Sequence, residues 1–155
     1  MTTSPSLDTV LLCVDGSEAA ENALRDGFAL LAPVQRTVIV TVVEASDPTL
    51  VTGTGMAGGV ISVEEYEELD REAAQDGWDT AEQAATLLGL RDPEIHVLRG
   101  SPGESLCSLA RELNARAIVM GSRGRGGIKR ALLGSVSDHV VRNAPCPVVI
   151  TGPAS

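Results

Sequence analysis

The part of the sequence best suited to chemistry is a basic, glycine-rich segment near the C-terminus, residues 121–130 (GSRGRGGIKR). Its ten positions hold four basic residues, four glycines and no acid, although the whole chain has a formal net charge of -9. Glycine lets successive backbone N–H groups converge on one anion, and basic side chains add positive charge around it. The segment is therefore a candidate phosphate-binding loop. The alternative is that its glycines only make turns and its basic residues are only solvated.

A helix start follows this loop at Gly134 and Ser135. The N-terminus of a helix has free N–H groups and a partial positive charge, and both favour a bound anion. Ser135 can cap this helix or give its hydroxyl group to a phosphate oxygen, and Ser137 lies deeper in the first turn. The loop and the helix start together predict one anion-binding site.

Two well-known nucleotide motifs are absent. The Walker A pattern needs glycine and lysine followed by serine or threonine, and no such triplet occurs in the chain. The dinucleotide pattern G-x-G-x-x-G is also missing after the first apolar segment, where Asp15, Gly16 and Ser17 stand. A dinucleotide oxidoreductase is therefore not indicated. Asp15 is either a ligand contact or an ordinary turn residue or cap of the first helix.

Five short apolar segments rich in β-branched residues predict strands at residues 9–14, 37–43, 94–98, 116–120 and 147–151. Helical patterns lie between them at 17–31, at 104–113 and at 135–143, and a long acidic helix follows Ser62 and continues to Leu88. Ser62 and Ser101 each precede a glutamate by three residues, which predicts two capping boxes.

Strands that alternate with helices predict an α/β fold with an open five-stranded parallel sheet and helices on both faces. Ligands of such sheets bind beyond the carboxyl ends of the strands, so function is expected in the loops after the first and fourth strands. The 155 residues match one domain. We expect a flexible N-terminus over residues 1–8 and a long mobile loop between Glu44 and Ile61.

Composition excludes several classes of partner and site. Aromatic residues make up 2% of the chain and its pI is near 4.6, which argues against nucleic-acid binding. The three cysteines have neither zinc-site nor disulfide spacing and are expected to be small buried residues, while His96 and His139 are too isolated for a metal site. Without a visible secretory signal or an apolar run long enough for a membrane helix, we expect a cytoplasmic protein and no membrane partner.

The spacing of the glycines resembles a known family. Gly121 and Gly124, then nine residues, then Gly134 and Ser135 reproduce the G-2x-G-9x-G-[ST] pattern of ATP-binding universal stress proteins. The resemblance also includes residues 14–17 (VDGS), 120–124 (MGSRG), 133–137 (LGSVS) and 144–148 (APCPV), and it extends over essentially the whole chain.

This resemblance implies a Rossmann-like sheet with strand order 3-2-1-4-5 and a homodimer paired through the last strand, which begins at Pro147 and ends at Thr151. It implies that ATP phosphates meet the loop and the helix start, that Asp15 faces the ribose, and that the backbone near Val42 meets adenine. The implied nucleotide-binding residues are Asp15, Val42, Met120, Gly121, Arg123, Gly124, Gly134, Ser135, Val136 and Ser137.

Three functions stay open at this point. The chain can be an ATP-dependent sensor and regulator in a stress response, a slow ATPase or phosphotransferase, or a scaffold without a ligand. AMP or cyclic AMP can replace ATP, because the loop indicates that phosphate is held but not how many phosphates. Asp15 could hold Mg²⁺ through water, but no residue is evident that would orient an attacking water. We therefore assign no catalytic residue and expect binding with at most weak hydrolysis.

Overall fold

The computed structural model describes residues 8–31, 33–52, 61–123 and 133–152. Its elements, in chain order, are β1 (Thr9–Cys13), α1 (Glu18–Leu31), β2 (Arg36–Val43), α2 (Thr49–Thr52), α3 (Val63–Leu87), β3 (Glu94–Arg99), α4 (Pro102–Glu112), β4 (Ala117–Gly121), α5 (Ser135–Asn143) and β5 (Val148–Thr151). Residues 1–7 of the predicted flexible N-terminus lie outside the described residues. Asp8, the last residue of that predicted terminus, accepts a hydrogen bond from the Arg116 guanidinium group at 2.9 Å.

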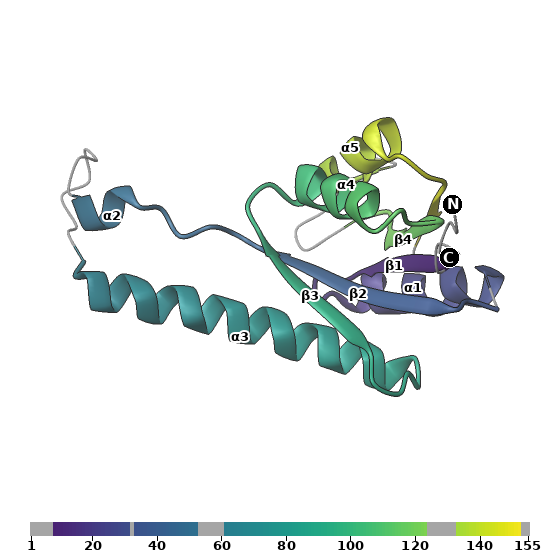
Figure 1. Cartoon of the computed structure of the whole chain (residues 1–155), viewed down its shortest axis with the longest axis horizontal. Coiled ribbons are helices and arrows are strands. Elements are labelled where there is room, and N and C mark those ends of the chain that lie inside the picture. Colours follow the sequence, from purple (N-terminus) through teal and green to yellow (C-terminus); the bar gives the residue numbers. More distant parts are fainter. Residues whose placement is uncertain (1–7, 32, 53–60, 124–132, 153–155) are drawn as a thin grey trace, which may run out of the picture.

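The five strands form one parallel sheet in the order β3-β2-β1-β4-β5, so the predicted fold class and strand order are confirmed. β1 lies at the centre, and each of its five residues is buried. Its neighbours are β2, which pairs Val40 with Cys13, and β4, which pairs Val119 with Leu12. Figure 1 shows the sheet between two layers of helices.

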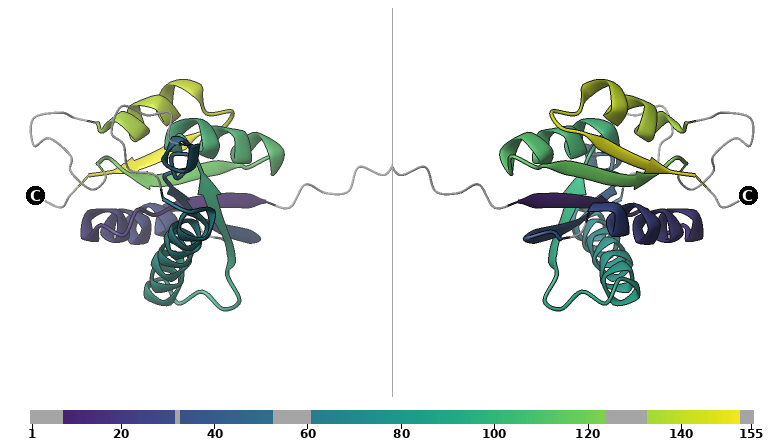
Figure 2. Two further views of the ribbon diagram at one scale, coloured as in Figure 1. Left: turned by 90° about the vertical axis from the view of Figure 1, so that its left-hand side faces the viewer. Right: turned by 90° about the vertical axis from the view of Figure 1, so that its right-hand side faces the viewer.

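The core has two halves, one on each face of the sheet. Helices α4 and α5 cover one face and α1 and α3 cover the other, as the side views show (Figure 2). Successive residues of β1 enter different halves: Leu11 packs under α4 and α5, whereas Val10 and Leu12 pack against the other layer. Both faces are therefore apolar, which explains why the strand sequences are apolar at consecutive positions.

Helix α3 is longer than the sheet that it covers. Its 25 residues span roughly 37 Å at 1.5 Å per residue, whereas the strands have at most eight residues. The predicted apolar stripe is consequently buried only in its second half, where Gly77, Ala81 and Ala84 meet the core. In the first half Leu69 keeps 47% of its surface exposed. Figure 1 shows this half projecting beyond the sheet.

The connection between Glu44 and Ile61 contains the short helix α2 in its described part. The Asp47 carboxylate accepts hydrogen bonds from the backbone N–H of Thr49 at 2.9 Å and from its hydroxyl group at 2.7 Å. The Tyr66 hydroxyl group of α3 donates to the Ser46 carbonyl oxygen at 3.0 Å. Residues 53–60 of the predicted mobile loop lie outside the described residues.

One of the two predicted capping boxes forms. At Ser62 the side chain accepts from the Glu65 N–H group at 3.1 Å, and the Glu65 carboxylate accepts from the Ser62 N–H group at 2.8 Å. The box predicted at Ser101 is wrong, because that side chain makes no capping bond. The backbone there has ψ of 116° instead of the 164° found at Ser62. Pro102 nevertheless occupies the first turn of α4, as expected.

The cysteines behave as small core residues, as the sequence predicts. Cys13 and Cys107 are buried and Cys146 is half-buried against the same core, and all three are free thiols. Burial raises the pKa of the Cys13 thiol to about 12. A thiol of that pKa is not a nucleophile near neutral pH. No helix in the described part of the chain is long and apolar enough to cross a membrane.

Candidate functional site

The candidate site lies where the carboxyl ends of β1 and β4 meet. The two strands are paired side by side, but the chain leaves β1 towards β2 and reaches β4 from β3. The direction of the crossovers therefore reverses between β1 and β4, and helices cannot fill the space at that edge. The segment after β1 holds Asp15, and the segment after β4 holds Ser122 and Arg123.

Asp15 makes the turn that starts α1. Its carboxylate accepts from the Ser17 N–H group at 3.0 Å and from the Ser17 hydroxyl group at 2.6 Å, and Gly16 between them has φ of 77°. The Ser17 hydroxyl group in turn accepts from the Ala20 N–H group at 3.2 Å, so Ser17 caps the helix. Asp15 is therefore a turn residue, which is one of the two alternatives that the sequence leaves open. Its role as a ribose contact stays a prediction.

Val42 lies in a part of β2 that extends past the end of β1. Cys13, the last residue of β1, pairs with Val40, and the Val14 N–H group donates to the Val40 carbonyl oxygen at 2.9 Å. Backbone groups of alternate residues in a strand face the same neighbour. The N–H and C=O groups of Val42 therefore face the side of β1, beyond the last residue of that strand.

The segment after β4 is tied to α5 and to β5 through one residue, Ser122. Its carbonyl oxygen accepts from the Gly134 N–H group at 2.7 Å and from the Ser137 hydroxyl group at 2.8 Å. Its N–H group donates to the Thr151 carbonyl oxygen at 2.9 Å. Sequence reasoning did not assign a role to Ser122, since these bonds use its backbone and its side-chain type gives no signal.

Helix α5 starts without a side-chain cap. Gly134, not Ser135, is the N-cap residue, and the first intrahelical bond joins the Asp138 N–H group to the Gly134 carbonyl oxygen at 2.9 Å. The capping role considered for Ser135 is therefore wrong, because Ser135 is already the first helical residue, where it is exposed. The N–H groups of residues 135–137 precede the first residue that can bond within the helix.

At the two described glycines of this edge a Cβ atom would make ordinary van der Waals contacts with neighbouring backbone. A Cβ atom on Gly134 would lie 3.5 Å from both the Ser122 carbonyl oxygen and Arg123 Cα, and one on Gly121 would lie 3.4 Å from Ala20 Cα. Gly134 has φ of -75°, so positive φ is not the reason for glycine there. Gly124 lies outside the described residues.

Two further predicted site residues differ in what they can offer. Met120 is 6% exposed and its side chain belongs to the core under α4 and α5, so only its backbone can reach a ligand. Arg123 is half-buried, and its buried Nε atom has no hydrogen-bond partner in the part of the chain that the structure describes. A buried guanidinium N–H group without a partner is costly. The Arg123 side chain is therefore suited to an anion at this edge.

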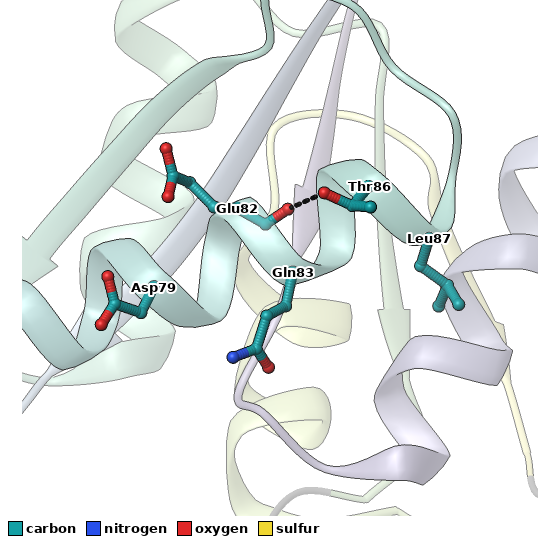
Figure 3. Close-up of a pocket in the computed structure, with 5 residues that line it drawn as sticks. All are labelled: Asp79, Glu82, Gln83, Thr86 and Leu87. Atoms are coloured by element: carbon teal, nitrogen blue, oxygen red, sulfur yellow. Dashed lines mark hydrogen bonds between the residues drawn. The ribbon is translucent and has the colours of Figure 1, made fainter.

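A surface depression elsewhere does not fit an anion. Its volume is about 520 Å³, and Figure 3 shows that the lining side chains all come from α3: Asp79, Glu82, Gln83, Thr86 and Leu87. Two carboxylates and no basic side chain line it, so a phosphate would be repelled. Within the described residues, no three histidine, cysteine or acidic side chains gather as a metal site.

The comparisons with known proteins agree with this architecture. Residues 6–152 match the model of the universal stress protein family. The chain belongs to the universal stress protein family. A curated relative, universal stress protein YxiE of Bacillus subtilis, is 30% identical over 145 residues, covering 91% of this chain and 96% of the relative.

Solved structures show the same fold for this universal stress protein. The hypothetical protein MJ0577, the subject of a structure-based assignment of biochemical function, aligns with a TM-score of 0.70 and 18% identity, over 97% of this chain and 99% of its own. A universal stress protein in complex with cAMP aligns with a TM-score of 0.57 and 24% identity, over 96% and 98% of the two chains. At these identities the likeness shows the fold alone. The ligand therefore has to be inferred from the residues of the site.

Proposed function

We propose that this universal stress protein binds an adenine nucleotide, with ATP as the main ligand, and acts as a nucleotide-dependent regulator in a stress response. The observation that carries the proposal is the uncapped N-terminus of α5, which Ser122 holds beside Arg123. The buried Nε atom of Arg123 has no hydrogen-bond partner among the described residues. An anion at this position would accept hydrogen bonds from the first N–H groups of α5 and from the Arg123 guanidinium group.

The proposed ligand lies across the carboxyl edge of the sheet. Its phosphates would meet Arg123, the backbone of Gly121 and Gly124, and the free N–H groups that follow Gly134 in the first turn of α5, with the Ser135 hydroxyl group exposed nearby. Its ribose would face Asp15. Its adenine would meet the backbone N–H and C=O groups of Val42, which point past the end of β1. A backbone donor and acceptor on one residue can pair with a base edge without a polar side chain.

The number of phosphates distinguishes ATP from its alternatives. A fold relative has been solved with cAMP, so a cyclic or monophosphate nucleotide is the alternative ligand. Arg123 and the basic residues of the loop favour ATP, because they bring more positive charge than a single phosphate requires. With ATP bound, Mg²⁺ would be held mainly by the phosphates. The Asp15 carboxylate, which follows β1, would contribute through a water molecule.

Binding with little turnover is the proposed mode of action. Hydrolysis needs a group that orients water next to the terminal phosphate. The Asp15 carboxylate is engaged by Ser17 at two short distances and starts the turn on the β1 side. The slow ATPase remains the second candidate activity, and we assign no catalytic residue to it.

We propose a homodimer paired through β5, and action in the cytoplasm. The strand lies at one edge of the sheet and all four of its residues are half-buried. The opposite edge strand, β3, carries a charged cluster at its start, where Glu94 bonds Arg36 and His96. Charges protect a strand edge from pairing, and an apolar strand without them invites it. The β5 edge is therefore the better candidate for self-association.

The proposal is tested by native mass spectrometry of freshly purified protein, followed by calorimetric titration with ATP, AMP and cAMP. A co-purifying adenine nucleotide, or ATP binding tighter than the other two, is the expected result. A phosphate-release assay in the same buffer separates a regulator from a slow ATPase. Protein that binds none of the three nucleotides would refute the proposed function and leave the scaffold role.

A further inference from the structure

Ser137 has a different environment from the other predicted phosphate contacts. It is 2% exposed, whereas Ser135 in the same helical turn is exposed. Its hydroxyl group lies 2.8 Å from the Ser122 carbonyl oxygen and 3.0 Å from the Gly134 carbonyl oxygen. A hydroxyl group has one hydrogen to donate, and both neighbours are acceptors. The Ser137 hydroxyl group is therefore directed into the protein.

The Ser122 acceptor is itself firmly placed. Its N–H group bonds the Thr151 carbonyl oxygen at the end of β5, so the sheet fixes the orientation of Ser122. Its carbonyl oxygen then receives two donors from α5, the Gly134 N–H group at 2.7 Å and the Ser137 hydroxyl group. The first turn of α5 is thus attached to the sheet at two points that are three residues apart.

We propose that Ser137 is a positioning residue that holds the N-terminus of α5 against β4, so that the N–H groups of Ser135 and Val136 face the ligand phosphates. This inference rests on the proposed nucleotide site and deepens it. The Gly134 N–H group is taken by Ser122, so it does not serve the ligand. The Ser137 side chain acts on the ligand through backbone position and does not touch it.

The consequence is a dependence on phosphate. Adenine and ribose are assigned to β2 and to the segment after β1, so adenosine makes no use of the α5 N-terminus. A loosened α5 would weaken ATP while sparing adenosine. A general loss of stability would instead weaken neither ligand at temperatures where the protein stays folded, or both equally.

The first experiment compares Ser137→Ala with the wild type and with Ser137→Thr, which keeps the hydroxyl group. Titration calorimetry with ATP and with adenosine gives the dissociation constants. We expect Ser137→Ala to weaken ATP about three- to tenfold, the equivalent of one lost hydrogen bond, and to leave adenosine within about twofold. Ser137→Thr should restore most of the ATP affinity. Equal losses for ATP and adenosine would overturn the positioning role.

The matched control is Thr9→Ala. Thr9 is another hydroxyl residue that is 1% exposed. It lies at the amino end of β1, whereas the candidate site lies at the carboxyl ends of the strands. This variant loses a buried hydroxyl group without touching α5. It should lower the free energy of unfolding by a similar amount and leave the affinities for ATP and adenosine unchanged. A selective loss of ATP binding in Thr9→Ala would count against the assignment to Ser137.

The second experiment needs no ligand. Hydrogen exchange of the Gly134 amide in the ligand-free protein reports the bond to Ser122 directly. Ser137→Ala should accelerate this exchange several-fold, and Thr9→Ala should not. Unchanged Gly134 exchange with weakened ATP binding would mean that Ser137 contacts the ligand directly, and it would overturn the inference. If the wild type binds no nucleotide, the proposed function fails. Accelerated exchange in Ser137→Ala would still support the positioning role of Ser137, and unchanged exchange would refute it.

Discussion

The imidazole ring of His139 on α5 lies directly against the backbone of Gly103 on α4. A Cβ atom at position 103 would lie 2.6 Å from His139 Cδ2 and 2.7 Å from its Cγ atom, closer than atoms of this kind approach each other. The two helices therefore owe their separation to a ring that packs where a side chain is absent. Since α5 carries the candidate phosphate site at its N-terminus, this contact also sets where that site lies.

Replacing Gly103 with alanine should destabilise the protein. The added methyl group would force the ring or the helix away, at a cost of about 1–3 kcal/mol, offset in part by up to about 1 kcal/mol of helix propensity. We expect the melting temperature to fall by about 3–6 °C, measured by calorimetry. In a His139→Ala background the same substitution should be neutral or stabilising. A Gly103→Ala variant as stable as the wild type would show that the contact has room to relax.

The sequence predicted the elements well where local chemistry decides them. The serine and glutamate at positions 62 and 65 mark the start of α3 and form the expected capping box. The apolar runs of β1, β2 and β4 are strands because both faces of the sheet are covered. The strand order followed from the family resemblance, since periodicity alone does not say which strand lies beside which.

The sequence could not predict features that depend on how elements meet. The Ser122 backbone bonds involve residues 12 to 29 positions away, and a serine in a loop gives no sign of them. The apolar stripe of α3 looks uniform in sequence, but its burial depends on how far the sheet extends. Gly77 illustrates the same limit: a Cβ atom there would lie 2.9 Å from the Val43 and Val97 side chains, so it is a packing residue.

The charged cluster at the start of β3 should make stability depend on pH. Hydrogen bonds from Arg36, with a smaller contribution from His96, lower the pKa of Glu94 below its ordinary value of 4.5. A carboxylate whose pKa is lowered by folding stabilises the folded state at pH values above its ordinary pKa. This stabilisation is lost as pH falls through the pKa of the folded state. Glu94→Gln should therefore reduce stability at pH 7, by at most about 1 kcal/mol for a half-exposed pair.

Urea unfolding of the wild type and Glu94→Gln at pH 7 and near pH 3 measures this effect. The difference between the two proteins should shrink as pH falls below the ordinary pKa of 4.5 and towards the lowered pKa of folded Glu94. Asp47→Asn serves as a comparison, because the pKa of Asp47 is also lowered, but by hydrogen bonds from Thr49 on the exposed connection. A Glu94→Gln difference that is the same at both pH values would contradict an ionic contribution.

Neutralising Arg123 should weaken ATP more than AMP. If the guanidinium group meets the outer phosphates, Arg123→Gln removes a charge-assisted hydrogen bond of about 1.5–3 kcal/mol, which corresponds to a loss of about tenfold or more for ATP. The control is Arg142→Gln, which removes a positive charge from the far end of α5, where Arg142 pairs with Asp138 at 2.9 Å. Calorimetric titrations should show near-wild-type affinities for that control. Equal losses for ATP and AMP in Arg123→Gln would place the side chain away from the outer phosphates.

The β5 edge permits a test that separates dimer formation from folding. The backbone N–H and C=O groups of its successive residues face β4 and the outside in turn. The carbonyl oxygens of Pro147 and Thr151 face β4, where they accept from Ile118 and Ser122 at 3.0 and 2.9 Å. Val149 therefore also faces β4 with its backbone, and Val148 faces outward. Proline lacks an N–H group. Its effect in this strand therefore depends on whether the missing N–H group would face β4 or face outward.

Val148→Pro should abolish the dimer while leaving the bonds to β4 in place, whereas Val149→Pro should break the pairing with β4 and unfold the edge. Sedimentation velocity at micromolar concentration measures the first effect, and urea unfolding measures the second. We expect a dimeric wild type, a folded Val148→Pro monomer with ATP affinity close to the wild type, and a clearly less stable Val149→Pro. A Val148→Pro variant that remains dimeric would move the interface to another surface, and a monomeric wild type would remove the dimer while the nucleotide site at α5 stands independently.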